Sequence, residues 1–290
     1  MTHPSAVANT GVLLVDCPDR KGILAAIANF LYQHGGNVLH ADQHQDNKLG
    51  LFFMRIEWDL KDFDLDRESL REAFEPIARD FQIRWQLEYS QDRRRVAILV
   101  SRYLHCLVDL LYRHEVGELK CTIPLIISNH SDAKLLADFH SIPYHHIPVV
   151  TARKPEAERA QLEVLREHSI DLVVLARYMQ VLSPDFVAAY PRRIINVHHS
   201  FLPAFSGAQP YRAAFERGVK LIGATAHYAT EILDDGPIIE QDVARISHRD
   251  QVEDLTQKGR DLERVVLARA VRWHLEHRIL CYGNKTVVFD

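Results

Sequence analysis

The ten residues Ile194–Pro203, which read IINVHHSFLP, decide how we interpret the second half of the chain. The predicted strand Arg193–Val197 is followed at once by polar side chains, among them His198 and His199. In open parallel sheets ligands bind beyond the carboxyl ends of the strands, so chemistry is expected here. If the strand geometry continues, Asn196 and His198 share one side and His199 faces away. An amide that holds a carbonyl oxygen and an imidazole that moves a proton together suit an electrophilic carbonyl.

A second polar cluster lies further along, at Glu231–Pro237 (EILDDGP), behind a predicted strand that carries His227. The Gly-Pro pair marks a turn, and acidic turn residues are usually solvated caps. The residues alone therefore leave open whether Asp234 or Asp235 is catalytic. A zinc site needs three or four converging ligands, and no set of residues here has that spacing, so we predict that there is no metal.

Outward from these clusters, strands alternate with helices. Predicted strands at 96–101, 121–128, 145–149, 172–175 and 193–197 are separated by predicted helices at 104–114, 133–139, 156–168 and 184–190. This order implies parallel βαβ crossovers and a Rossmann-like α/β domain with a mostly parallel sheet. The chain continues through a helix at 209–216, apolar runs at 220–228 and 237–246, a long helix at 250–277 and final strands at 278–282 and 286–289.

The first 90 residues follow a different order. Apolar periodicity predicts strands at 11–17, 37–45, 51–58 and 81–89 and helices at 23–33 and 67–80. Strand, helix, strand, strand, helix, strand is the ferredoxin-like βαββαβ pattern. The charged break QDRRR at 91–95 separates this pattern from the alternating one. We therefore predict two domains, 9–90 and 94–290.

Composition narrows the class of protein. The 290 residues carry 35 basic and 39 acidic side chains, a net charge of −4, so nucleic acid is not expected as a partner. Four scattered cysteines fit a reducing cytosol and argue against a disulfide scaffold. Without a secretory signal or an apolar run long enough for a membrane span, we expect a cytoplasmic protein with no membrane partner.

The second domain resembles the folate-dependent formyltransferase family. The resemblance rests on N-V-H (196–198), S-F-L-P (200–203), G-A-T (223–225), His227 and L-D-D-G-P (233–237). It implies that Asn196, His198 and Asp234 are catalytic. For His227 two interpretations stay open, support of the loop of Asp234 or the filling of a polar gap. The segment LARYMQVLSP (175–184) resembles the family's pterin pocket, which points to Met179, Gln180 and Leu182, and the loop Thr230, Glu231, Ile232 and Leu233 walls the same pocket. The implied substrate is 10-formyltetrahydrofolate, with no separate cofactor.

The first domain resembles an ACT domain, a small-molecule-sensing module. Its D-x-P-D-R-x-G-I-x-A signature stands at residues 16–25. This resemblance implies an amino-acid effector site at Asp16, Asp19, Arg20 and Gly22, and a homo-oligomer. An ACT domain fused to a formyltransferase domain is similar to the formyltetrahydrofolate deformylase family. Further stretches at 198–205, 207–208, 210–211, 220–225, 258–261 and 282–286 match that family.

One departure bears on the reaction. Purine-pathway transferases have a glycine-rich turn after the first strand, where backbone N–H groups cradle a phosphate. Here Ser101–Cys106 (SRYLHC) contains no glycine, so a formyl acceptor with a phosphate lacks its phosphate-binding site. Water needs no such site. We therefore expect hydrolysis of 10-formyltetrahydrofolate to formate and tetrahydrofolate, which supplies formate for purine synthesis and balances the one-carbon folate pool. The expected mechanism has Asp234 as the base for water, while Asn196 and protonated His198 hold the oxyanion. Two alternatives stay open, a formyltransferase to a small amine and a catalytically inactive amino-acid sensor.

Overall fold

The computed structural model describes residues 9–203 and 210–290. Three parts of the chain lie outside the described residues: the family matches at 204–205 and 207–208, the first residue of the helix expected at 209–216, and the chain before residue 9. Contacts divide the chain into two compact units. One comprises the residues up to Arg93 together with Glu276–Tyr282 and Val287–Asp290, and the other comprises Arg94–Leu275 and Gly283–Thr286.

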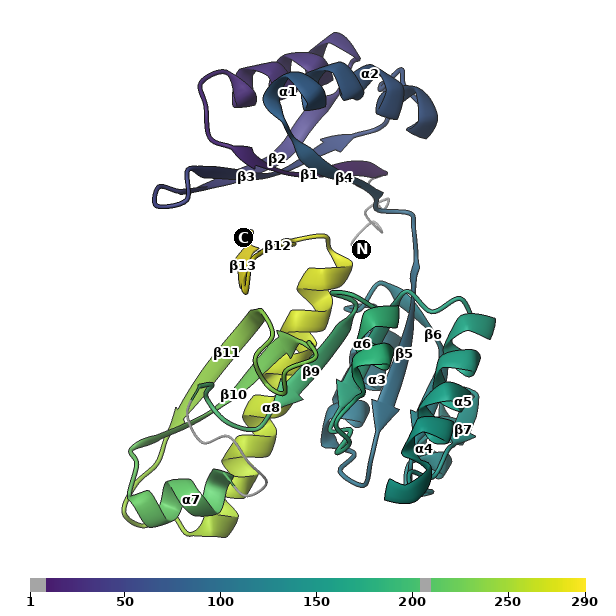
Figure 1. Cartoon of the computed structure of the whole chain (residues 1–290), viewed down its shortest axis with the longest axis vertical. Helices are drawn as coiled ribbons and strands as arrows, with labels where there is room; N and C mark the ends of the chain where they lie inside the picture. The colour runs from purple at the N-terminus through teal and green to yellow at the C-terminus, as the bar shows by residue number, and fades with distance from the viewer. Residues whose placement is uncertain (1–8, 204–209) are drawn as a thin grey trace, which may run out of the picture. The chain divides into compact units, whose positions relative to one another are not determined.

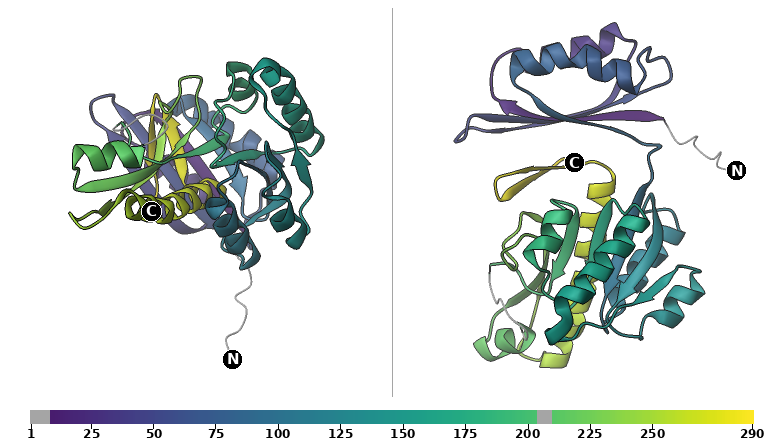
Figure 2. Two further views of the ribbon diagram at one scale, coloured as in Figure 1. Left: turned by 90° about the horizontal axis from the view of Figure 1, so that it is seen from below. Right: turned by 45° about the vertical axis from the view of Figure 1, so that its right-hand side comes forward.

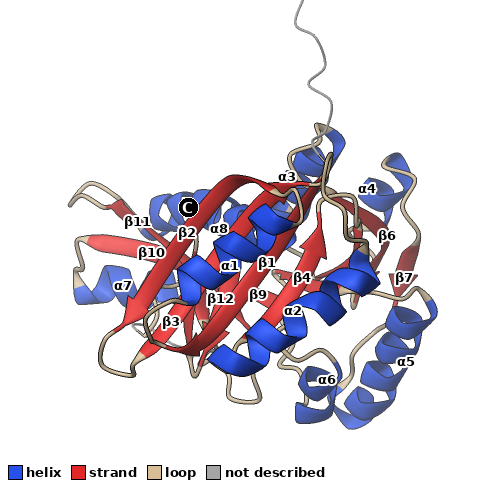
Figure 3. Cartoon of the chain, turned by 90° about the horizontal axis from the view of Figure 1, so that it is seen from above, coloured by secondary structure: helices blue, strands red, loops and turns tan. Residues whose placement is uncertain are grey.

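The first unit contains the expected βαββαβ order. Its elements are β1 (Thr10–Pro18), α1 (Ile23–Gln33), β2 (Asn37–Asp46), β3 (Leu51–Asp59), α2 (Arg67–Phe81) and β4 (Arg84–Tyr89). The strands form an antiparallel sheet in the order β2-β3-β1-β4, and α1 and α2 lie across one face of it (Figure 3). Fully buried side chains from both layers, such as Ile27, Trp58 and Phe74, form the core between them. The ferredoxin-like prediction is confirmed.

Two further strands, β12 (Ile279–Tyr282) and β13 (Lys285–Val288), form a separate two-stranded sheet near the end of the chain (Figure 1). Leu280 and Phe289 share a small apolar core with Leu14 and Phe53 of the first unit. The turn between the two strands belongs to the second unit.

The second unit is built on a seven-stranded sheet in the order β11-β10-β9-β8-β5-β6-β7, seen from two further directions in Figure 2. Its elements in chain order are β5 (Arg94–Val100), α3 (His105–Glu115), β6 (Cys121–Ser128), α4 (Lys134–Phe139), β7 (Tyr144–His146), the 3-10 turn η1 (Thr151–Arg153), α5 (Lys154–Glu167), β8 (Leu172–Ala176), α6 (Pro184–Ala189), β9 (Ile194–His198), α7 (Pro210–Arg217), β10 (Leu221–Tyr228), β11 (Ile238–Arg245) and α8 (Val252–Leu275). Strands β5 to β9 are parallel to one another, whereas β10 and β11 are antiparallel additions. The predicted mostly parallel α/β sheet is confirmed.

Helices cover this sheet and leave the carboxyl ends of β8 and β9 for the site. The apolar faces of α5 and α6 pack on β5, β6, β8 and β9, with Leu165 and Phe186 fully buried. Helix α8 lies beside α3 and along β9, β10 and β11. Strand β7 is shorter than the expected 145–149, because Pro148 lacks the N–H that a strand ladder needs.

Candidate active site

A cavity of about 300 Å³ opens at the carboxyl ends of β8 and β9. Its lining brings together candidate site residues that lie more than 50 positions apart in the sequence, such as Met179 and Asp234. The lining residues are Leu175, Arg177, Tyr178, Met179, Gln180, Val181, Leu182, Val187, Asn196, Val197, His198, His199, His227, Ala229, Thr230, Glu231, Ile232, Leu233 and Asp234. Every predicted catalytic and folate-binding position therefore lies on one cavity wall or another.

Asn196 and His227 face each other across the β9–β10 ladder. They are register partners, so their side chains project to the same face of the sheet. Asn196 Nδ2 lies 3.1 Å from His227 Nε2, and His227 Nδ1 donates to the Tyr228 carbonyl oxygen at 3.0 Å. A carbonyl oxygen can only accept, so this bond fixes a hydrogen on Nδ1. This pairing orients the Asn196 amide and leaves its second N–H for another acceptor.

His198 and Asp234 form the central ion pair of the site. His198 Nδ1 lies 3.1 Å from Asp234 Oδ2, and both side chains are largely buried. His227 Nε2 lies 3.6 Å from the other oxygen, Oδ1. Burial by itself raises the pKa of Asp234, but the hydrogen bonds and charges of His198 and His227 outweigh it and hold this pKa well below its ordinary value. The carboxylate is therefore firmly ionised.

The opposite nitrogen of His198 is the open position of the pair. Nε2 is buried and has no hydrogen-bond partner within residues 9–203 and 210–290. A buried unpartnered ring nitrogen is costly in a folded protein, which favours a ligand that completes its hydrogen bonding. A carbonyl oxygen or a proton-accepting nitrogen has the chemistry of such a partner.

The loop that carries Asp234 is shaped by its neighbours. Asp234 itself has a φ of 56°, a left-handed conformation that is uncommon for a residue with a side chain. A Cβ on Gly236 would lie 1.7 Å from the Tyr228 carbonyl oxygen, so only glycine fits there. Asn284 Nδ2 also donates to the Asp235 carbonyl oxygen at 2.7 Å. These backbone contacts together fix the conformation of the loop and so the direction of the Asp234 carboxylate.

The glycine-and-threonine motif of β10 fastens the segment after His198. Thr225 Oγ1 donates to the Ser200 carbonyl oxygen at 2.9 Å and accepts from the Leu202 N–H at 3.1 Å. A Cβ on Gly223 would lie 2.7 Å from a backbone oxygen of β11 and 2.9 Å from Phe201. These contacts lock the chain that leaves β9 and so fix His198 at the strand end.

The predicted folate-binding residues form two walls of the cavity. Met179, Gln180 and Leu182 follow β8, and the Met179 N–H is held by Ser101 Oγ at 3.0 Å. On the other wall Ile232 and Leu233 are 66% and 62% exposed, a high value for apolar side chains beside a cavity. Such walls suit a flat aromatic ligand, which would cover them.

His199 does not lie where we expected. Strand β9 ends at His198, so the alternation of side chains stops there and His199 lines the same cavity. Its ring centroid lies 5.2 Å from that of His198 and 5.9 Å from that of Tyr211. The expectation that His199 faces away is wrong, because it extended strand geometry one residue too far.

Sequence reasoning missed a buried polar cluster next to the cavity. Glu263 on α8 is 1% exposed and accepts a hydrogen bond from His105 at 2.7 Å and from the Tyr211 hydroxyl at 2.6 Å. Arg177, which follows β8 with a φ of 61°, lies with Nε 3.4 Å from Glu263. The only sequence signal was the charge of Glu263 on the apolar face of a predicted helix.

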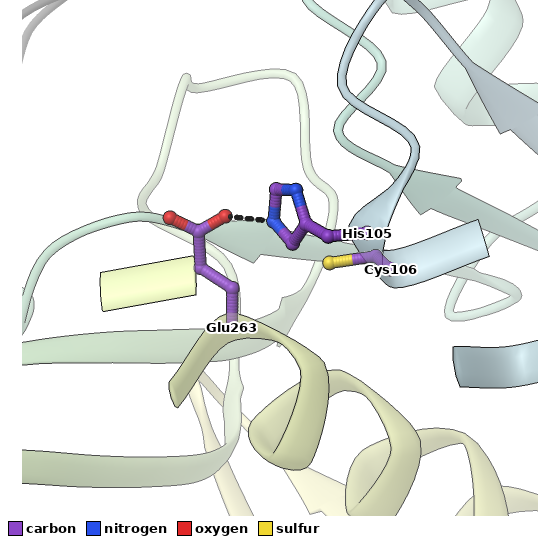
Figure 4. Close-up of side chains that lie close together, drawn as sticks. All are labelled: His105, Cys106 and Glu263. Carbon is purple, nitrogen blue, oxygen red and sulfur yellow. Dashed lines mark hydrogen bonds and ion pairs between the residues drawn. The ribbon is translucent and has the colours of Figure 1, made fainter. Parts of the chain in front are cut away.

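Figure 4 shows Glu263, His105 and Cys106 close together, and their possible ligand atoms lie within 4.8 Å of one another. Their chemistry does not suit a metal. Both oxygens of Glu263 already accept hydrogen bonds, and a guanidinium lies beside them. Burial, with Glu263 nearby, raises the pKa of the Cys106 thiol, which keeps it protonated, whereas a metal ligand must be a thiolate. The absence of metal stays a prediction.

The predicted effector residues lie at the start of the first unit. Gly22 has a φ of 97° and precedes the first turn of α1, which has no side-chain cap within the described chain. Asp16 forms an ion pair with Arg84, and Asp19 accepts from Gln45 at 3.2 Å. Arg20 donates to the Asp80 carbonyl oxygen, and its guanidinium lies over a phenylalanine ring.

The chain is similar to known proteins over nearly its whole length. Residues 94–271 match the formyl transferase family model and residues 11–75 match the ACT domain model. The formyltetrahydrofolate deformylase of Synechocystis sp. is 58% identical over 97% of this chain and 98% of its own length, and that of Bacillus subtilis is 50% identical over 97% and 94%. The crystal structure of a formyltetrahydrofolate deformylase from Pseudomonas syringae pv. tomato is 50% identical, with a TM-score of 0.95 over 98% of this chain and 95% of that one.

The fold and the Asn–His–Asp site thus define a formyl transferase domain that carries an ACT domain ahead of it. With its identity to the Synechocystis and Bacillus enzymes over nearly its whole length, the chain belongs to the formyltetrahydrofolate deformylase family. Among residues 9–203 and 210–290, no helix has the length and apolar character to cross a membrane.

Proposed function

We propose that this chain hydrolyses 10-formyltetrahydrofolate to formate and tetrahydrofolate, with Asn196, His198 and Asp234 as its catalytic residues. The observation that carries the proposal is the His198–Asp234 pair, which leaves the buried Nε2 of His198 without a partner in the described chain. That nitrogen belongs to a cavity whose other walls suit a folate.

The ion pair prepares both proton transfers of the reaction. Protonated His198 donates through Nε2 to the formyl oxygen, and the free N–H of Asn196 donates to the same oxygen, so both stabilise the oxyanion that forms when water attacks. Asp234 accepts the proton of the water. Its low pKa makes it a weak base at rest, but this changes during the reaction. As water attacks, the negative charge that develops on the formyl oxygen offsets the charge of His198, so the carboxylate loses part of its countercharge and becomes a stronger base. His198 then passes its proton to the leaving nitrogen as the C–N bond breaks.

His227 acts as a positioning residue in this scheme. It holds the Asn196 amide through Nε2 and lies near Asp234 Oδ1, while its Nδ1 is tied to the backbone. The pterin lies between Met179, Gln180 and Leu182 on one side and Thr230, Glu231, Ile232 and Leu233 on the other. The exposed Ile232 and Leu233 close over the bound ring.

The test is a formate assay on purified protein with 10-formyltetrahydrofolate as the sole substrate. Formate and tetrahydrofolate should appear in equal amounts, with no acceptor amine and no added metal or cofactor. A formylated amine that forms only when an amine is supplied would support a transferase instead. Tight binding of an amino acid with no turnover would support an inactive sensor.

We place the reaction in the cytoplasm, where the four free cysteines stay reduced. The formate released supplies purine synthesis, and the reaction balances the one-carbon folate pool. We propose a homo-oligomer, since ACT-like domains commonly pair side by side. Sedimentation of the purified protein tests this, and a monomer at all concentrations would refute it.

We further propose that the ACT domain binds an amino acid, with glycine and methionine as candidates because both report on the one-carbon pool. The unblocked N–H groups at the start of α1 suit a carboxylate, next to Asp16, Asp19, Arg20 and Gly22. Titration of glycine and methionine against formate release tests this. Arg20→Gln should abolish the response without changing basal turnover, whereas the matched surface variant Lys61→Gln should keep it.

A route for the signal runs through the final turn of the chain. Strand β12 belongs to the first unit, the turn that follows it belongs to the second, and Asn284 in this turn holds the backbone of Asp235. The covalent chain thus joins the effector domain to the loop of Asp234. Asn284→Ala should weaken the amino-acid response more than it weakens basal turnover, and an unchanged response would exclude this route.

A further inference from the structure

We propose that Arg177 forms a subsite for a small carboxylate in the active-site cavity, and that this subsite takes the formate released by hydrolysis. The inference rests on the proposed function for the identity of its ligand. The chemistry of the subsite rests on the surroundings of Arg177 alone.

The Arg177 guanidinium is buried and incompletely paired. The residue is 9% exposed, and Nη1 has no hydrogen-bond partner within residues 9–203 and 210–290. Its Nε is 3.4 Å from Glu263 Oε2, beyond a good hydrogen bond, and its carbon Cζ lies 5.4 Å from the centre of the Tyr103 ring. A buried cation whose donors are unsatisfied is a strong site for an anion.

Glu263 does not fully compensate this charge. The same carboxylate accepts from His105 at 2.7 Å and from Tyr211 at 2.6 Å, so its charge is shared between these two donors and the guanidinium. Burial raises the pKa of Glu263, but the two hydrogen bonds and the Arg177 charge outweigh it and lower this pKa, which keeps the carboxylate ionised. A planar two-oxygen anion matches the guanidinium fork better than a neutral ligand does.

The position of Arg177 suits a product rather than the substrate's formyl group. Leu175 of β8 pairs with Asn196 of β9. Strand β9 continues to His198, and Arg177 follows the end of β8 at Ala176. Both residues are among those that line the same cavity. The formyl amide is neutral, whereas formate carries a full negative charge. The guanidinium therefore distinguishes the product from the group that it came from and draws formate away from the reacting nitrogen.

The experiment measures formate inhibition of turnover, together with direct binding of carbon-13 formate to the full-length protein by NMR line broadening. Arg177→Gln should raise the formate inhibition constant at least about tenfold, because it removes one charge-assisted hydrogen bond to formate. The KM for folate should change little. Glu263→Gln, which removes the competing charge, should lower the formate inhibition constant. Arg260→Gln is the matched control, because Arg260 lies over the same Tyr103 ring but is exposed and outside the cavity lining.

A formate inhibition constant that rises in Arg177→Gln and falls in Glu263→Gln supports the subsite. A purely structural role would move the constant in the same direction in both variants. An unchanged constant in Arg177→Gln overturns the proposal, and so does a rise in the KM for folate without a change in formate inhibition. If either variant fails to fold, Arg177→Lys keeps the charge, loses the fork and should give an intermediate constant. Formate binding by NMR does not need turnover, so a protein that binds formate at Arg177 but releases none would refute the proposed function and leave the subsite standing.

Discussion

Asp234 and Glu263 are two carboxylates of one domain, and each is held by two or more basic or hydroxyl side chains. They differ in whether a hydrogen-bonding position around them stays without a partner in the described chain. Asp234 lies on a loop with left-handed backbone, and its partner His198 keeps a ring nitrogen without a partner in the described chain. Glu263 lies inside α8, and both of its oxygens already accept hydrogen bonds. In the proposed function the first pair serves chemistry, whereas the second serves the stability and charge of the fold around Arg177.

The largest effect should come from Asp234→Asn. The substitution keeps the shape of the side chain and removes the base, so turnover should fall by about 10²–10⁴, the usual worth of general base catalysis. Folate binding, measured by equilibrium dialysis, should be retained. Loss of binding in parallel with turnover would place Asp234 in substrate binding instead.

Removal of the oxyanion donors should cost nearly as much. We expect His198→Ala and Asn196→Ala each to reduce kcat by about 10² or more. His199→Ala tests the selectivity of the site, because His199 lines the cavity whereas Asp234 pairs with His198 and His227. It should cost much less, and an equal loss would make His199 a catalytic residue.

Glu263→Ala should act on stability rather than on chemistry. It leaves the buried Arg177 charge without its partner, and loss of one partner of a buried pair typically costs about 3–5 kcal/mol in the free energy of unfolding. Urea unfolding measures this. Arg264→Ala on the same helix is the control, since its ion pair with Asp261 is exposed and should contribute little. Equal losses in the two variants would contradict the distinction between the two carboxylates.

The low pKa of Asp234 fixes the direction of a pH effect. A carboxylate whose pKa is depressed in the folded state stabilises the protein above its unfolded-state pKa, and this contribution is lost as pH falls through the folded-state pKa. The difference in unfolding free energy between the wild type and Asp234→Asn should therefore be largest at neutral pH and shrink below pH about 4. A difference that grows on acidification would mean that Asp234 is not held as an ion by its two histidines.

The smallest expected effect is that of metal removal. Dialysis against a strong chelator should leave turnover unchanged, because the His105, Cys106 and Glu263 atoms are committed to hydrogen bonds or to a protonated thiol. Activity that is lost on chelation and restored by a divalent ion would overturn the mechanism and make Asp234 a ligand rather than a base.

Much of the fold could be predicted, because local patterns carry it. The apolar periods located the helices and strands of both units, and their order identified the two sheet types. Tertiary packing decides the remainder. No local pattern tells that Leu280 and Phe289 share a core with Leu14 and Phe53, more than 200 residues away in sequence.

The candidate site likewise contains residues that the sequence predicts and residues that only the fold brings together. Asn196, His198 and Asp234 stand in motifs whose spacing is visible in the sequence, and the structure brings them together. Arg177 and Glu263 stand 86 residues apart in segments that look ordinary, and only the fold makes them a pair. The position of His199 was missed for a further reason, because a strand's end cannot be located to one residue from its composition.

The most direct test of water as the acceptor is turnover in water labelled with oxygen-18. With 10-formyltetrahydrofolate as the only other reactant, we predict that the formate released carries one labelled oxygen, while the second oxygen comes from the formyl group. The label should be taken up by the wild type at its full rate and by Asp234→Asn only at that variant's reduced rate. Absence of formate until an amine is added, with the formyl group then found on the amine, would contradict hydrolysis at this site.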